Sequence, residues 1–171
     1  MTGLYIQTGD DNVYYSTARS MARFGLLILN KGNWNGTTVL GDTNYYNQMT
    51  NTSQTLNLSY GYLWWLNGKT SCMVPTSQIV FPTMISPNAP ADMFAALGKN
   101  GQLIDIVPSK KLVFIRMGNA PDGGDVPFTL NDSIWIKINK LSCKTSAISH
   151  TGPHRISIST IDNNHFKIES D

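Results

Sequence analysis

Histidine, cysteine and charged side chains are scarce in this chain of 171 residues, and each shortage narrows the possible functions. The three histidines, His150, His154 and His165, lie near the C-terminal end, so acid–base chemistry elsewhere must use lysine, tyrosine or a carboxylate. Cys72 and Cys143 could pair in an exported protein, but they form no C-x-x-C or Cys/His spacing. We therefore expect no metal site and no cofactor.

Charge and hydropathy exclude two kinds of partner. Charged residues make up 14% of the chain and the net charge is +2, and the longest basic run is Lys110-Lys111. No nucleic-acid partner is expected from so weak a basic character. No apolar stretch approaches the ~18 residues of a membrane span, and the first residues carry no secretory signal. The length and the 41% apolar content predict one domain with a sizeable core.

The first half of the chain predicts two helices and a strand. Ser16 is suited to cap a helix over about 17–31, which carries an apolar stripe at helical spacing. Asp42 is suited to cap a second helix that runs to Met49. The aromatic run 60–66 predicts a strand that ends at Asn67-Gly68.

The second half predicts a loop, three strands and a closing helix. Residues 70–92 contain four prolines and no periodicity, which indicates a long loop. Residues 93–118 predict three short antiparallel strands. A final helix over 131–141 would be capped by Asn131 or Asp132, and residues 142–171 are expected to be a poorly ordered linker or tail.

The tetrad Gly98-Lys99-Asn100-Gly101 joins the first two of these three strands. Its glycines let the backbone approach a ligand closely, which favours a binding or catalytic edge. A plain turn with solvated polar residues is the alternative, and composition alone favours it.

Three segments, in order, resemble the β-lactamase-related serine hydrolases, which include class C β-lactamases, penicillin-binding-protein-like esterases and 6-aminohexanoate-oligomer hydrolases. The segment 15–25, YSTARSMARFG, resembles the family's S-T-A-x-D-M-A-R-F helix. The segment 60–65, YGYLWW, is similar to its Y-G-x-G-W-W strand, with Leu63 in place of a glycine. Residues 94–113 look like its closing three-strand unit.

This resemblance implies an α+β fold in which helices flank an antiparallel sheet, here its C-terminal part. It implies acyl transfer from an ester or amide, a class that includes β-lactams, to a serine in S-x-x-K, with a Y-x-N tyrosine assisting. No S-x-x-K occurs in the sequence, and Arg19 and Arg23 cannot replace the lysine because arginine does not deprotonate. Tyr45-Tyr46-Asn47 spells Y-x-N, but it follows the helix that it should precede.

We therefore interpret residues 1–141 as a partial hydrolase domain that lacks the N-terminal portion with nucleophile and base. No catalytic residue is assigned, and the chain alone is expected to be inactive. The alternatives are a non-catalytic binding module or an inactive remnant of the fold. The family resemblance makes a periplasmic or secreted location plausible, and a small ester or amide is the expected substrate of the completed enzyme.

The resemblance places an oxyanion-hole or substrate-binding wall at residues 98–102: Gly98, Lys99, Asn100, Gly101 and Gln102. Two registers are possible. In one, Lys99-Asn100-Gly101 replaces K-T-G and the N–H of Gln102 is the donor. In the other, which we prefer, Gly98 is the motif glycine and the N–H of Lys99 is the donor. The Lys99 side chain would hold a substrate carboxylate, or it is simply solvated.

Overall fold

The structure is a computed structural model that describes residues 3–75, 77–119, 126–141, 156–162 and 165–170. The chain divides into two units, residues 1–140 and residues 141–171, and each is described by itself. The predicted site lies in the first unit. Cys143, His150 and His154 lie outside the described residues.

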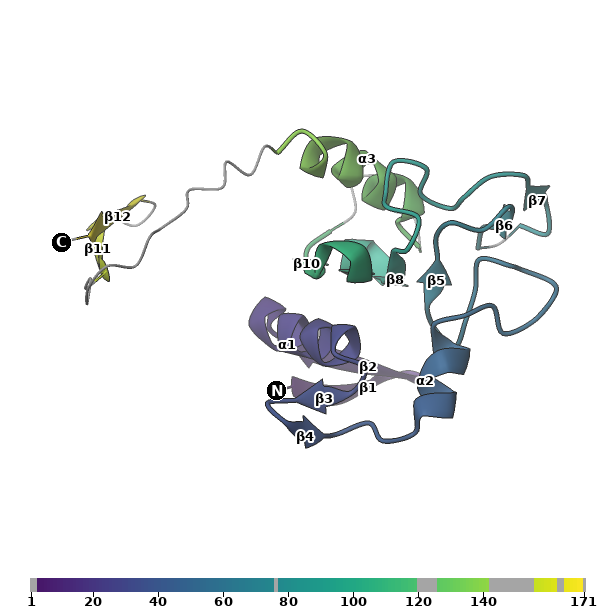
Figure 1. The fold of residues 1–171 in the computed structure, drawn as a ribbon, viewed down its shortest axis with the longest axis horizontal. Helices are drawn as coiled ribbons and strands as arrows, with labels where there is room; N and C mark the ends of the chain where they lie inside the picture. Colours follow the sequence, from purple (N-terminus) through teal and green to yellow (C-terminus); the bar gives the residue numbers. More distant parts are fainter. Residues whose placement is uncertain (1–2, 76, 120–125, 142–155, 163–164, 171) are drawn as a thin grey trace. The chain divides into compact units, whose positions relative to one another are not determined.

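A four-stranded antiparallel sheet forms the centre of the first unit (Figure 1). Its order is β10-β9-β8-β5, and the strands are β5 (Trp65–Leu66), β8 (Phe94–Gly98), β9 (Gln102–Val107) and β10 (Leu112–Arg116). Three of these strands are those predicted within 93–118. Together with the helices they confirm the α+β class.

Three helices accompany the sheet in the described part of the chain: α1 (Ala18–Leu29), α2 (Thr43–Met49) and α3 (Phe128–Ile138). Helix α1 packs against β9 and β10 on one face, and α3 packs on the other face, where Trp135 reaches Asp105 of β9. The alternation of side chains along each strand therefore builds two cores. The core on the α1 side contains Ile28, Met49, Trp64, Leu66, Phe94, Ile104 and Ile106; that on the α3 side contains Ala89, Met93, Ala95, Leu97, Leu103, Val107 and Trp135.

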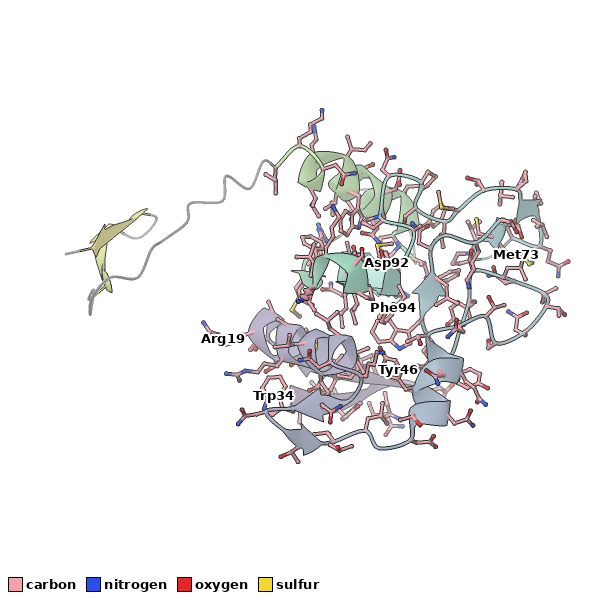
Figure 2. The ribbon with its side chains drawn as sticks, viewed as in Figure 1. Arg19, Trp34, Tyr46, Met73, Asp92 and Phe94 are labelled. Carbon is pink, nitrogen blue, oxygen red and sulfur yellow. The ribbon has the colours of Figure 1, made fainter. Side chains whose placement is uncertain are left out.

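Figure 2 shows three side chains that differ in burial: Phe94 of β8, Arg19 of α1 and Tyr46 of α2. Phe94 is buried and packs edge-on against Trp64, with ring centroids 5.2 Å apart. Arg19 lies on the exposed side of α1. Tyr46 of α2 is partly buried against the α1-side core, and its hydroxyl donates to the carbonyl of Ile28 at 3.0 Å.

The structure corrects the predicted N-terminal cap of α1 and confirms that of α2. Thr17, not Ser16, caps α1: its backbone is extended, and its hydroxyl oxygen accepts from the N–H of Ser20 at 3.2 Å. Ser16 instead ends the preceding strand, and α1 ends at Leu29, before the predicted residue 31. Asp42 caps α2 as predicted, by accepting from the N–H of Tyr45 at 2.8 Å.

The closing helix begins earlier than predicted. Helix α3 starts at Phe128, follows Pro127 and has no side-chain cap. Asn131 and Asp132 lie inside the helix, and their side chains bond residues of other elements instead of capping it. Asn131 donates to Asp105, and Asp132 accepts from Asn88. A cap pattern in sequence cannot be distinguished from such long-range contacts.

The aromatic run 60–66 is mostly not a strand, which corrects the prediction. Only Trp65–Leu66 pairs with β8, while Tyr60 forms a single bridge to Trp65. The chain turns between them, with Leu63 at φ 64°. At Gly61 a Cβ atom would come within 2.1 Å of the carbonyl oxygen of Met49, so only glycine fits there.

Four short hairpins make up the remaining strands of the described residues. They are β1 (Gly3–Thr8) with β2 (Asp11–Ser16), β3 (Asn33–Trp34) with β4 (Thr37–Thr38), β6 (Cys72–Met73) with β7 (Val80–Phe81), and, in the second unit, β11 (Ile156–Asp162) with β12 (His165–Ser170). The β6–β7 pair lies inside the predicted loop 70–92, whose other described residues form no helix or strand.

Candidate functional site

The glycine-flanked tetrad forms the tight connection between β8 and β9. Gly98 ends β8 and pairs with Gln102, the first residue of β9. The three residues between them form a 3₁₀ turn in which Asn100 and Gly101 take φ values of 62° and 87°. Lys99 and Asn100 are exposed and Gly101 is buried. The positive φ values account for asparagine and glycine at these two positions.

Two side chains fasten this turn to the end of β10. The Arg116 guanidinium donates through Nη1 to the carbonyl of Gly101 at 2.6 Å and through Nη2 to that of Asn119 at 2.7 Å. The Gln102 amide bonds Gly118 twice, donating to its carbonyl at 3.0 Å and accepting from its N–H at 3.2 Å. The Gln102 side chain is therefore a brace for the turn.

A small cavity of about 170 Å³ lies beside the turn. Gly98 and Gln102 line it, and Lys99, Asn100 and Gly101 do not. Tyr14 and Ser16 from the N-terminal hairpin also line it. The five predicted site residues are thus contiguous in space, but only two of them line this cavity.

No catalytic dyad of the expected kind is assembled in the part of the chain that the structure describes. Ser16 lines the small cavity, but the residue three places on is Arg19, which cannot serve as a base. The tyrosine of the Y-x-N spelling, Tyr45, is exposed on α2, and its ring packs against that of Tyr62 with centroids 5.8 Å apart. Neither Tyr45 nor Asn47 lines the small cavity.

Asp105 is an ionisable group that the sequence interpretation missed. Its carboxyl is fully buried between β9 and α3, where it accepts from Trp135 Nε1 at 2.8 Å and from Asn131 Nδ2 at 3.1 Å. Burial raises the pKa of Asp105 to about 7, and the two hydrogen bonds only partly oppose that rise. A single acid within the apolar run 103–107 was the sequence signal that could have found it.

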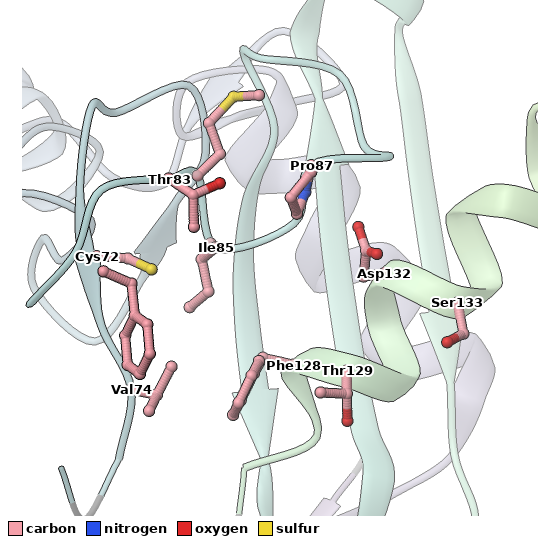
Figure 3. A pocket seen from close by; sticks show the side chains of 11 residues that line it. Cys72, Val74, Thr83, Ile85, Pro87, Phe128, Thr129, Asp132 and Ser133 are labelled. Atoms are coloured by element: carbon pink, nitrogen blue, oxygen red, sulfur yellow. The ribbon is translucent and has the colours of Figure 1, made fainter. Parts of the chain in front are cut away.

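A larger cavity of about 580 Å³ lies between residues 72–87 and the start of α3 (Figure 3). Cys72 lines it with a free and buried thiol, whose pKa burial raises above its ordinary value. The walls are mainly apolar, and no sequence signal marks them because most of them come from an aperiodic loop.

The described residues contain neither a metal-binding cluster nor a membrane-spanning helix. They contain no group of three or more histidine, cysteine, aspartate or glutamate side chains that could hold a metal ion. None of the helices in this described part is long and apolar enough to cross a bilayer.

Comparison with known proteins does not assign the chain to a family. No family model, no curated protein and no solved structure matches it.

Proposed function

We propose that this chain provides the oxyanion-side wall of an acyl-transfer site of the β-lactamase-related serine hydrolase type, with nucleophile and base supplied by another segment. The substrate would be a small ester or amide. On this proposal the turn at residues 98–102 presents backbone N–H groups to the carbonyl oxygen of the substrate, and the chain alone forms no acyl-enzyme.

The observation that carries the proposal is the geometry of the segment 60–65. The resembling family has glycine at the positions of Gly61 and Leu63. A Cβ at position 61 would collide with the carbonyl of Met49, and position 63 has a φ of 64°, which glycine adopts most easily. The backbone at positions 61 and 63 therefore favours glycine, as the family's motif has it, although this chain places a leucine at position 63.

The braced turn gives further support. Arg116 bonds the carbonyl of Gly101 within the turn, and Arg116 and Gln102 also bond Asn119 and Gly118 after β10, so the turn is tied to the end of β10 without a ligand. Preorganised donors are what oxyanion stabilisation requires, since they need no reorientation as charge develops.

The test has two parts. The purified chain is incubated with an activated ester and with a fluorescent penicillin, and its intact mass is measured; we expect no covalent adduct. The coding sequence upstream of Met1 is then read; we expect an in-frame S-x-x-K followed by Y-x-N. An upstream stop codon without these motifs contradicts the proposal, and so does covalent labelling of the chain alone.

The longer protein then distinguishes the two registers. Replacing the backbone amide at Lys99 by an ester removes its N–H without changing its side chain, and the same replacement at Gln102 is the matched control. We expect the change at Lys99 to lower kcat by about 10²–10³, the effect of removing one oxyanion donor. A loss of that size at Gln102 alone would support the other register.

Reversible binding of the ester or penicillin by the chain, without an adduct and without upstream motifs, would favour the non-catalytic binding module instead.

A further inference from the structure

The larger cavity has the composition of a small-molecule site. Its volume of about 580 Å³ lies within the range of about 300–1,000 Å³ that such sites occupy. Cys72 and Ile85 form its deep part and are 3% and 4% exposed. Its walls are lined mainly by apolar side chains, with Thr83 and three residues of α3 as the polar groups; the apolar lining is Cys72, Val74, Phe81, Met84, Ile85, Pro87 and Phe128.

Asp132 is the one charged residue among those that line this cavity. Asp132 lies on the second turn of α3 and is half-buried, and the other ten lining residues carry no charge. Its carboxylate accepts from the N–H of Asn88 at 2.8 Å and from the Asn88 side chain at 2.7 Å. Among the described residues no lysine, arginine or histidine pairs with it. A carboxylate has about four acceptor positions, so capacity remains for a cation.

The polar groups of α3 are more accessible than the buried Cys72 and Ile85. Thr129 and Ser133 are exposed, lie on the same helix as Asp132 and line the same cavity (Figure 3). A ligand would therefore meet apolar surface at depth and the carboxylate nearer to solvent. This arrangement suits a molecule with an apolar body and a polar head.

We propose that this cavity binds a small amphiphile with an apolar body and an ammonium head group, which Asp132 accepts through charge-assisted hydrogen bonds. The argument is independent of the acyl-transfer proposal, because none of the residues 98–102 lines this cavity. An anionic head is disfavoured by the full charge of Asp132, which exceeds the partial positive charge of a helix N-terminus. A neutral head lacks the charge-assisted bond.

The probes are octylammonium, octanol and octyl sulfate, each below the concentration at which it forms micelles, with the full chain in isothermal titration calorimetry. We expect octylammonium to bind about tenfold more tightly than octanol, and octyl sulfate to bind most weakly. Each methylene added between hexylammonium and octylammonium should tighten binding about fourfold, as burial of apolar surface predicts.

Two variants separate charge from shape. Asp132→Asn should remove the preference for octylammonium over octanol and leave octanol binding unchanged. Asp10→Asn, at a turn outside the cavity, removes the same charge and should leave the preference intact. Thr129→Trp changes an exposed position at the rim and should weaken all three probes at least tenfold.

A chemical readout does not depend on the Asp132 variant. In the Cys143→Ser background, Cys72 is the single thiol, and a neutral maleimide reports on access to the deep part of the cavity. Bound octylammonium should slow its labelling in proportion to occupancy. The proposal is overturned if labelling is unaffected at saturation, if octyl sulfate binds as well as octylammonium, or if Asp132→Asn retains the preference.

Discussion

The buried carboxyl of Asp105 predicts how the stability of this protein depends on pH. Burial keeps the acid protonated in the folded chain up to about pH 7, whereas in the unfolded chain it ionises near its ordinary value of 3.8. Its stabilising contribution is therefore complete below pH 3.8 and is lost as the pH rises to about 7. Asp105→Asn places a neutral group of the same shape at this position and removes the titration.

The structure provides a partner for the neutral acid. Asn131 Oδ1 is buried without a hydrogen-bond partner among the described residues, while Asn131 Nδ2 donates to Asp105. A half-turn of the Asn131 amide brings Oδ1 to the carboxyl, where a protonated Asp105 can donate to it. In the Asp105→Asn variant the new side-chain amide can make the same bond, and its oxygen can still accept from Trp135.

The magnitude follows from the interval between the two pKa values. The folded value is about 7 and the unfolded value 3.8, so the interval is about three pH units. Each unit is worth 1.36 kcal/mol, which gives a loss of about 4 kcal/mol in the free energy of unfolding between pH 4 and pH 7. A loss of this size is a large fraction of the stability of an ordinary domain.

The assay is urea unfolding of the wild type and of Asp105→Asn at intervals between pH 3.5 and pH 8, analysed for the first unit. The two proteins differ only at position 105, so the difference between the two curves isolates Asp105. We expect the wild type to lose stability relative to the variant across this range, with a slope approaching about 1.4 kcal/mol per pH unit. Parallel curves, or a relative gain for the wild type as pH rises, would refute the reasoning.

Three other substitutions test the packing and the turns. Gly25→Ala, which raises helix propensity, should nevertheless destabilise by about 1–3 kcal/mol because its Cβ would lie 2.5 Å from Val113; adding Val113→Ala should restore part of that loss in a double-mutant cycle. Leu63→Gly should be more stable than Leu63→Ala by about 1 kcal/mol in denaturant unfolding, because only alanine retains a Cβ at φ 64°. Arg116→Ala should cost about 1–2 kcal/mol and speed hydrogen exchange at Gly101, whereas unchanged exchange would refute the brace.

The strands and the second helix were predictable because their signals are local. The runs of β8, β9 and β10 alternate with glycine- or proline-marked turns, and Asp42 precedes α2 with the required spacing. The starts of α1 and α3 could not be predicted in this way. Thr17 and Ser16 are equally suited as caps of α1, and Asn131 and Asp132 look like caps of α3 although they bond residues of other elements. Residues 60–64 are a turn because α2 approaches Gly61, which no local propensity encodes.

The candidate site divides in the same way. The sequence located the turn at residues 98–102, but it did not indicate that the side chains of Gln102 and Arg116 tie that turn to the end of β10. The larger cavity was invisible in sequence because residues from 72 to 133 build it without a shared motif. Pairing across such distances depends on how the elements pack, and packing is a property of the whole unit.

By itself the sequence determined the α+β class, the three consecutive strands, the position of their glycine-flanked turn, and the absence of S-x-x-K. These are matters of composition, period and spelling. Only the tertiary structure decided that Asp105 is buried and bonded to Trp135, and that Asp132 lines an apolar cavity, where it accepts from Asn88 and pairs with no cation among the described residues. The reason is physical: the charge state of an acid depends on the water and the partners around it, and chain order alone does not specify either.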